Sequence, residues 1–103
     1  MSHIKTLAMC GSMRFSDEMR TIAFELETKH GFNILQCTYD INGDKLSEEE
    51  INSITKMHYV KIDLSDGIYV ADIGGYIGDS VKKEILYALQ KNKEIYYHSE
   101  FIK

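Results

Sequence analysis

The chain has 103 residues, of which 44% are hydrophobic and 27% are charged. This composition excludes a disordered chain, and the length predicts one globular domain over residues 1–103. The net charge of −4 gives no basis for binding duplex DNA or an anionic membrane, and no apolar run is long enough to span one. Cys10 and Cys37 form no CxxC motif. Because we recognise no signal peptide, we expect reduced thiols and a cytoplasmic location.

The first part of the chain predicts a strand, a helix and a second strand. Residues 4–10 form a short apolar run that is typical of a buried strand. Ser16 is the expected N-cap of the following helix, and Gly31 lies just past its expected end. Residues 32–39 predict the second strand, and residues 40–46 contain an Asn-Gly pair that indicates a turn.

The rest of the chain continues the alternation of helices and strands. Ser47–Glu50 has the pattern of a capping box and begins a helix that we expect to end near residues 65–66. The β-branched and apolar run at 67–73 predicts a third strand, and a glycine-rich loop at 74–80 leads into a third helix. Residues 94–99 predict a last short strand.

The order β-α-β-α-β-α-β predicts a small Rossmann-like α/β fold. Its sheet should be parallel, with helices on both faces and the flavodoxin-like strand order 2-1-3-4. Such sheets bind ligands at the carboxyl ends of the strands, where the strand order reverses. The loop that starts at Gly11 and the loop at 74–80 should therefore meet at one site between the first and third strands.

The loop Gly11–Arg14 has features that suit a phosphate group. It leads into a helix N-terminus, where free N–H groups and the helix dipole favour an anion. Ser12 adds a hydroxyl group, and Arg14 adds a guanidinium fork. A plain turn between strand and helix, with a surface arginine, is the alternative.

Glu84 is the candidate reactive group of the second loop and its helix. It follows Ser80 by four residues and shares a helix face with the apolar residues Val81 and Ala88. A partly buried carboxylate at this position suits a nucleophile or a base. The alternative is a solvent-facing glutamate that the helix dipole stabilises beside neighbouring lysines.

The segments Cys10–Arg14 and Ser65–Ala88 together resemble the nucleoside 2-deoxyribosyltransferase superfamily, including its 2′-deoxynucleoside 5′-monophosphate N-hydrolases. The resemblance implies that Glu84 attacks the anomeric carbon and forms a glycosyl-enzyme ester. It also implies that Asp66 helps to position the sugar and the nucleophile. Ala8 departs from the family, which often has a tyrosine at this position of the first strand.

The same resemblance implies the substrate-binding residues. Gly11, Ser12 and Arg14 look like the phosphate-side loop of the monophosphate hydrolases, and Gly78 and Ser80 look like a second phosphate or sugar contact. In the second loop, Gly75 allows close approach of the backbone. Asp72 is either a second carboxylate beside Glu84 or an acceptor for loop N–H groups.

The glycine loop followed by Glu84 is also similar to the PGGxGTxxE loop of cytokinin-activating phosphoribohydrolases, without its proline and with longer spacing. Both families cleave the N-glycosidic bond of a nucleotide. We therefore expect cleavage or transfer at that bond of a (deoxy)nucleoside 5′-monophosphate, with no metal or cofactor. The alternative is a non-catalytic nucleotide-sensing module with the same pocket.

The sequence also gives expectations for His58, for Cys10 and for the oligomeric state. His58 lies on the apolar face of the second helix, which favours a core or dimer-interface histidine over a site residue. Cys10 is expected to be a small buried apolar residue without a base partner. Because a short domain makes a shallow pocket, we expect a homodimer or a higher homo-oligomer, formed through the helix that carries His58 and Tyr59.

Overall fold

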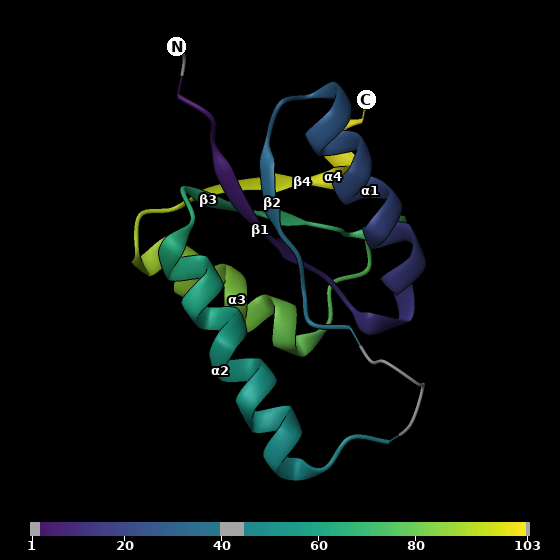
Figure 1. Ribbon diagram of the computed structural model, residues 1–103, viewed down its shortest axis with the longest axis vertical. Helices are drawn as coiled ribbons and strands as arrows, with labels where there is room; N and C mark the ends of the chain where they lie inside the picture. The colour runs from purple at the N-terminus through teal and green to yellow at the C-terminus, as the bar shows by residue number, and fades with distance from the viewer. Residues whose placement is uncertain (1–2, 40–44, 103) are drawn as a thin grey trace.

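The computed structural model describes residues 3–39 and 45–102, and its centre is a parallel sheet (Figure 1). The strands are β1 (Thr6–Cys10), β2 (Asn33–Leu35), β3 (Gly67–Val70) and β4 (Glu94–Tyr97). Their order is β2-β1-β3-β4, and each neighbouring pair is parallel. The predicted α/β class and the predicted strand order are therefore confirmed.

Helices cover both faces of the sheet, as predicted. On one face, α1 (Ser16–Lys29) and the short α4 (His98–Phe101) pack over Leu7, Met9 and Tyr69. On the other face, α2 (Glu48–Leu64) and α3 (Asp79–Gln90) pack over the alternate strand residues, which include Ala8, Cys10, Ile68 and Val70. Because successive strand side chains point to opposite faces, β1 and β3 each contribute to both cores.

The predicted start of the helix is correct for α2 and wrong for α1. At α2, the Ser47 Oγ accepts the Glu50 N–H at 3.1 Å, and the Glu50 Oε1 accepts the Ser47 N–H at 2.9 Å, so the capping box is confirmed. At α1, a 3₁₀ turn at Met13–Phe15 comes first. Ser16 is therefore already helical and does not cap the helix, so that prediction is wrong.

Strands are shorter than the sequence predicts. β2 ends at Leu35, because only three of its residues pair with β1. β3 ends at Val70, and the chain then turns through a second 3₁₀ segment, Ile73–Gly75. After β4 the chain forms α4, which the sequence analysis did not anticipate. Most of the predicted turn at 40–46 lies outside the described residues.

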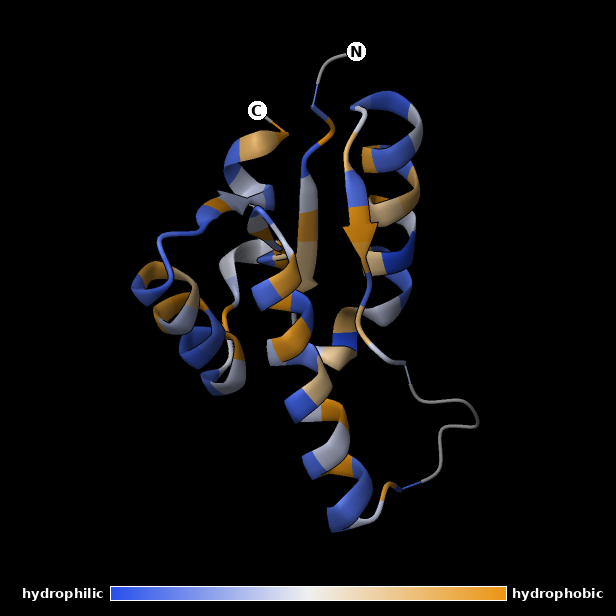
Figure 2. Ribbon diagram, turned by 60° about the vertical axis from the view of Figure 1, so that its left-hand side comes forward, coloured by the Kyte–Doolittle hydropathy of each residue, from blue (hydrophilic) through white to orange (hydrophobic). Residues whose placement is uncertain are grey.

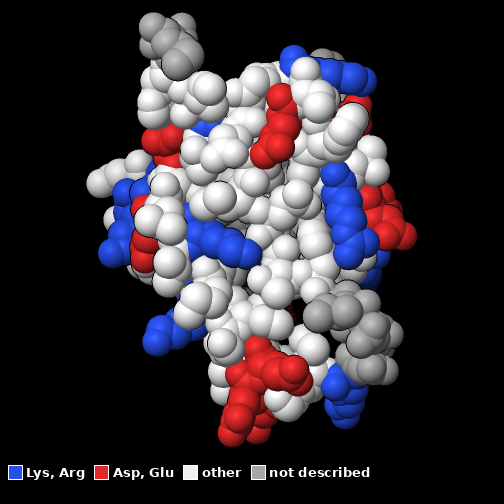
Figure 3. Space-filling view, viewed as in Figure 1, with Lys and Arg blue, Asp and Glu red and all other residues white. Residues whose placement is uncertain are grey.

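The first turns of α2 extend beyond the sheet (Figures 1 and 2). Three glutamates at this end of the helix, Glu48, Glu49 and Glu50, form the acidic patch at the bottom of Figure 3. Negative charges stabilise the N-terminus of a helix. Within the described part of the chain, no helix combines the length and the apolar character needed to cross a membrane.

Gly67 provides a test of the close packing between β3 and β4. A Cβ added at Gly67 would lie 2.5 Å from the backbone oxygen of Glu94. Gly67→Ala should therefore lower the free energy of unfolding by about 3 kcal/mol, because the two strands must move apart. Gly31→Ala is the matched control: Gly31 has a φ of +74° and no described atom within 4 Å of an added Cβ. The control should lose about 1 kcal/mol in urea unfolding, and an equal loss in both variants would contradict the packing argument.

Candidate functional site

A cavity of about 430 Å³ opens at the carboxyl ends of β1 and β3, on the face covered by α2 and α3. Its walls come from the loop after β1, the segments on either side of the undescribed residues 40–44, the inward face of α2 and the start of α3. The lining residues are Gly11, Ser12, Met13, Cys37, Thr38, Leu46, Ile51, Ile54, Thr55, His58, Tyr76, Gly78, Asp79, Ser80, Val81 and Glu84. The two loops that the sequence analysis placed together therefore do meet here.

The side chains of Glu84 and His58 are in contact in the wall of this cavity. The Oε1 of Glu84 on α3 lies 3.2 Å from the Nε2 of His58 on α2. The side chains are 15% and 10% exposed, respectively. A carboxylate this far removed from water keeps its charge at lower cost when a partner donates to it. Glu84 is thus partly desolvated, oriented and still reachable from the cavity.

Cys10 stands behind this pair at the end of β1. Its Sγ lies 3.4 Å from the same His58 Nε2, and its side chain is fully buried. Burial, and secondarily the nearby charge of Glu84, raises the pKa of Cys10 well above its usual range. Cys10 therefore does have a histidine neighbour, contrary to expectation, but burial keeps its thiol protonated.

Cys37 lies on another part of the cavity wall and is also protonated. Its thiol donates to the backbone oxygen of Met9 at 3.2 Å. Burial, together with the charge of Glu84, raises the pKa of Cys37 to about 12. Since neither thiol is ionised near pH 7, Glu84 is the better candidate for an anionic nucleophile in this cavity.

Four of the predicted binding residues line the cavity: Gly11, Ser12, Gly78 and Ser80. A Cβ at Gly11 would lie 2.9 Å from the Met19 Sδ and 3.2 Å from the Ala71 Cβ, so glycine is needed for this close turn. α3 begins after Gly78 without a side-chain cap. The N–H groups of its first turn are therefore free of such a bond and suit an anionic ligand.

Arg14 and Gly75 do not line the cavity. The Cζ of Arg14 lies 4.4 Å from the ring centroid of Tyr76, which is a cation–π contact on a residue that does line it. Gly75 has a φ of +82° and shapes the 3₁₀ turn after β3. The structure therefore places the Arg14 guanidinium against Tyr76, beside the cavity wall rather than in it.

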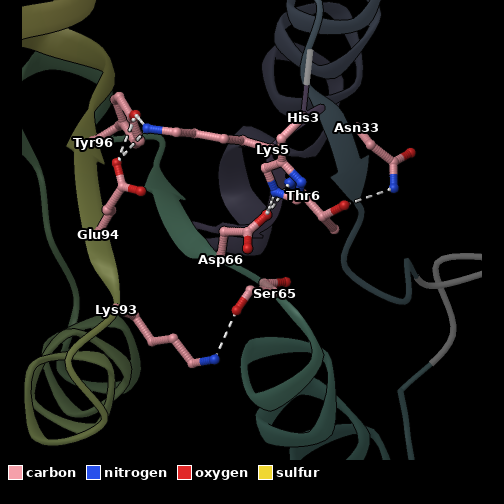
Figure 4. Close-up of polar contacts among 9 residues, drawn as sticks. All are labelled: His3, Lys5, Thr6, Asn33, Ser65, Asp66, Lys93, Glu94 and Tyr96. Carbon is pink, nitrogen blue, oxygen red and sulfur yellow. Dashed lines mark hydrogen bonds and ion pairs between the residues drawn. The ribbon is translucent and has the colours of Figure 1, made fainter. Parts of the chain in front are cut away.

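Asp66 lies at the amino ends of the strands, whereas the cavity with Glu84 lies at their carboxyl ends; Figure 4 shows the contacts of Asp66. It precedes β3, so it is at the amino end of a strand whose carboxyl end borders the cavity. Its Oδ2 accepts the Thr6 N–H at 2.8 Å and lies 3.2 Å from the His3 Nε2, and these contacts lower its pKa. The structure therefore does not bring Asp66 and Glu84 together, and Asp66 instead fixes the start of β1 to the start of β3.

Asp72 is buried but serves α4 rather than the cavity. Its two carboxylate oxygens accept the Ser99 N–H at 2.9 Å and the Ser99 hydroxyl at 2.6 Å. Asp72 is an acceptor, as one of its two readings expected, but its donors belong to α4 and not to the loop after β3. Its side chain turns toward α4, so it is not a second carboxylate of this cavity.

Sequence reasoning underrated His58 and Cys10 as site residues. The available signal was a histidine on an otherwise apolar helix face, since a buried imidazole needs a hydrogen-bonding partner. The partners themselves, Cys10 and Glu84, lie on other elements, and 48 residues separate Cys10 from His58. Only the packing of α2 and α3 on the same face of the sheet reveals that the three side chains meet.

Comparisons with known proteins add no family assignment. The chain matches no protein-family model, and no curated protein or solved structure is significantly similar to it. The resemblance drawn from the two loops is therefore neither supported nor opposed by these comparisons.

Proposed function

We propose that this protein cleaves or transfers at the N-glycosidic bond of a (deoxy)nucleoside 5′-monophosphate, with Glu84 as the nucleophile. The observation that carries the proposal is the position of Glu84, which is partly desolvated in a cavity wall and held by His58 at 3.2 Å. The cavity volume of about 430 Å³ falls in the range typical of small-molecule sites.

The reaction proceeds in two displacements at the sugar. A carboxylate oxygen of Glu84 attacks the anomeric carbon, and the base leaves with the electrons of the C–N bond and takes up a proton from water. Water then hydrolyses the glycosyl ester and restores Glu84; in transfer, a second base takes the place of water. With its proton on Nε2, His58 donates to the Glu84 Oε1 and fixes the carboxylate for attack.

The remaining wall offers places for the phosphate and the base. The Ser12 hydroxyl and the first turn of α3 supply neutral donors for the phosphate. Leu46, Ile51 and Ile54 supply an apolar surface that suits a flat base. Asp79, which also lines the cavity, opposes an anion, so the phosphate subsite depends on backbone N–H groups rather than on a cationic side chain.

A non-catalytic nucleotide-sensing module is the second candidate. The remoteness of Asp66 favours it, because the carboxylate that the resemblance assigns to sugar positioning is absent from the cavity. A sensor would bind the nucleotide through the same wall and leave it intact. Release of free base therefore separates the two candidates.

The Glu84→Gln variant tests the nucleophile. Gln keeps the size of the side chain and its contact with His58 but cannot form the ester, so base release should fall to the uncatalysed level. Nucleotide binding should persist. The measurement is chromatography of free base after incubation with a panel of nucleoside monophosphates, alongside calorimetry of binding.

Asp66→Asn is the matched control for this experiment. Since Asp66 lies at the opposite end of the strands from the cavity, its replacement should leave the rate of base release close to that of the wild type. Wild-type release by Glu84→Gln would exclude the ester mechanism. Binding by the wild-type protein without any release would instead establish the sensor.

The phosphate subsite predicts a preference for monophosphates over nucleosides. Charge-assisted hydrogen bonds from the α3 N-terminus and Ser12 to the phosphate contribute roughly 1.5–3 kcal/mol, which is about ten- to a hundredfold in affinity. Binding constants for one nucleoside and its 5′-monophosphate, measured by calorimetry, should differ by this factor. Equal affinities would remove the phosphate from the proposed substrate.

Assembly through α2 belongs to the same proposal. Of the two expected contact residues, His58 is buried, and Tyr59 is half-buried against Tyr87 with ring centroids 4.9 Å apart. The exposed apolar residues Met57, Val60 and Leu64 recur at helical spacing and offer a surface for a second copy. Light scattering at micromolar concentration should give a dimer mass that Leu64→Lys reduces to a monomer; a monomeric wild type would contradict this.

A further inference from the structure

We propose that Cys10, His58 and Glu84 form a binding site for one Zn²⁺ ion. The three side chains come from β1, α2 and α3, and each contributes one ligand atom to the cluster. The Sγ, the imidazole nitrogen and a carboxylate oxygen all lie within 4.8 Å of one another. The inference rests on this cluster alone and does not depend on the proposed reaction.

The separations between the ligand atoms fit tetrahedral zinc. Bonds of about 2.3 Å to sulfur, about 2.05 Å to nitrogen and about 2.1 Å to oxygen imply separations of about 3.6 Å (S to N) and about 3.4 Å (N to O). The structure has 3.4 Å between the Cys10 Sγ and the His58 Nε2, and 3.2 Å between the His58 Nε2 and the Glu84 Oε1. Both of these separations are therefore within a few tenths of an ångström of the zinc-bound values, and the Cys10 Sγ lies within 4.8 Å of the Glu84 carboxylate.

The types of ligand select zinc over hard cations. Thiolate and imidazole bind zinc well, whereas Mg²⁺ and Ca²⁺ prefer sites built from oxygen alone. His58 and Glu84 line the cavity and Cys10 lies behind them. An ion among them has three protein ligands and room on the cavity side for a water molecule, which is the arrangement of an open zinc site.

A divalent cation compensates for the negative charge of the ligands in this cluster. Zn²⁺ stabilises thiolate and carboxylate together, so the buried Cys10 thiol ionises when the metal binds. Binding therefore replaces the thiol proton with zinc, and one proton per site passes to the solvent.

Zinc in this site uses the carboxylate that the proposed function assigns to the nucleophile. A coordinated Glu84 cannot attack a sugar carbon, so Zn²⁺ should inhibit base release by the protein. Binding and inhibition are separate readouts. If the protein binds the metal but releases no base, the proposed function fails and the zinc site stands; if it releases base but binds no metal, the reverse holds.

Titration with Co²⁺, followed by displacement with Zn²⁺, tests the site directly. Co²⁺ accepts the same tetrahedral geometry as Zn²⁺, and its absorption spectrum depends on the type and number of its ligands. The wild type should bind one Co²⁺ per chain, with a thiolate-to-cobalt charge-transfer band in the near ultraviolet and visible bands of tetrahedral intensity. Zn²⁺ should abolish these bands, and a proton should be released as the metal binds.

Cys10→Ala and Cys37→Ala form a matched pair for this titration. Cys37 lies on the same cavity wall but outside the cluster. Cys10→Ala should remove the charge-transfer band and weaken Zn²⁺ binding at least about tenfold, whereas Cys37→Ala should leave both unchanged. His58→Gln, with its fold checked by circular dichroism, should weaken binding as Cys10→Ala does. A wild type without the band, or a band that only Cys37→Ala removes, would overturn the proposal.

Discussion

The pairing of β1 with β3 is the constraint on which the rest of the structure depends. Cys10 pairs with Val70 at the carboxyl ends of these strands, so the loops that follow them are neighbours. The core on one face then holds α2 and α3 against the same strands. As a result, Glu84 and His58 approach from two helices and meet beside the end of β1. If the strand order were different, no cavity would combine these side chains.

The architecture could be predicted from the sequence, because it follows from the hydrophobic pattern and from the right-handed connections between parallel strands. The alternation of elements gave a parallel sheet, and the capping box at Ser47 gave the start of α2. The exact start of a helix was harder to predict, because neighbouring residues offer alternative ways to begin it. Ser16 has the chemistry of an N-cap, yet the chain already turns at Met13 and makes Ser16 helical.

The candidate site was only partly predictable, because side-chain direction depends on tertiary partners. Glu84 faces the cavity as its helix position indicated, and Gly11, Ser12, Gly78 and Ser80 line it. Asp72 follows the correct strand but turns to Ser99 on α4, a helix that was not anticipated. Arg14 makes a cation–π contact with Tyr76, and Asp66 accepts the Thr6 N–H at the amino ends of β1 and β3. None of these three partners is indicated by spacing along the chain.

In the proposed reaction Glu84 becomes covalently attached to the sugar, and mass spectrometry can detect this intermediate. Protein that is quenched with acid during turnover of a nucleoside monophosphate should carry one sugar phosphate. Peptide mapping should place this adduct on Glu84, and the Glu84→Gln variant should lack it. Release of base with no adduct, or with an adduct on another residue, would contradict the account.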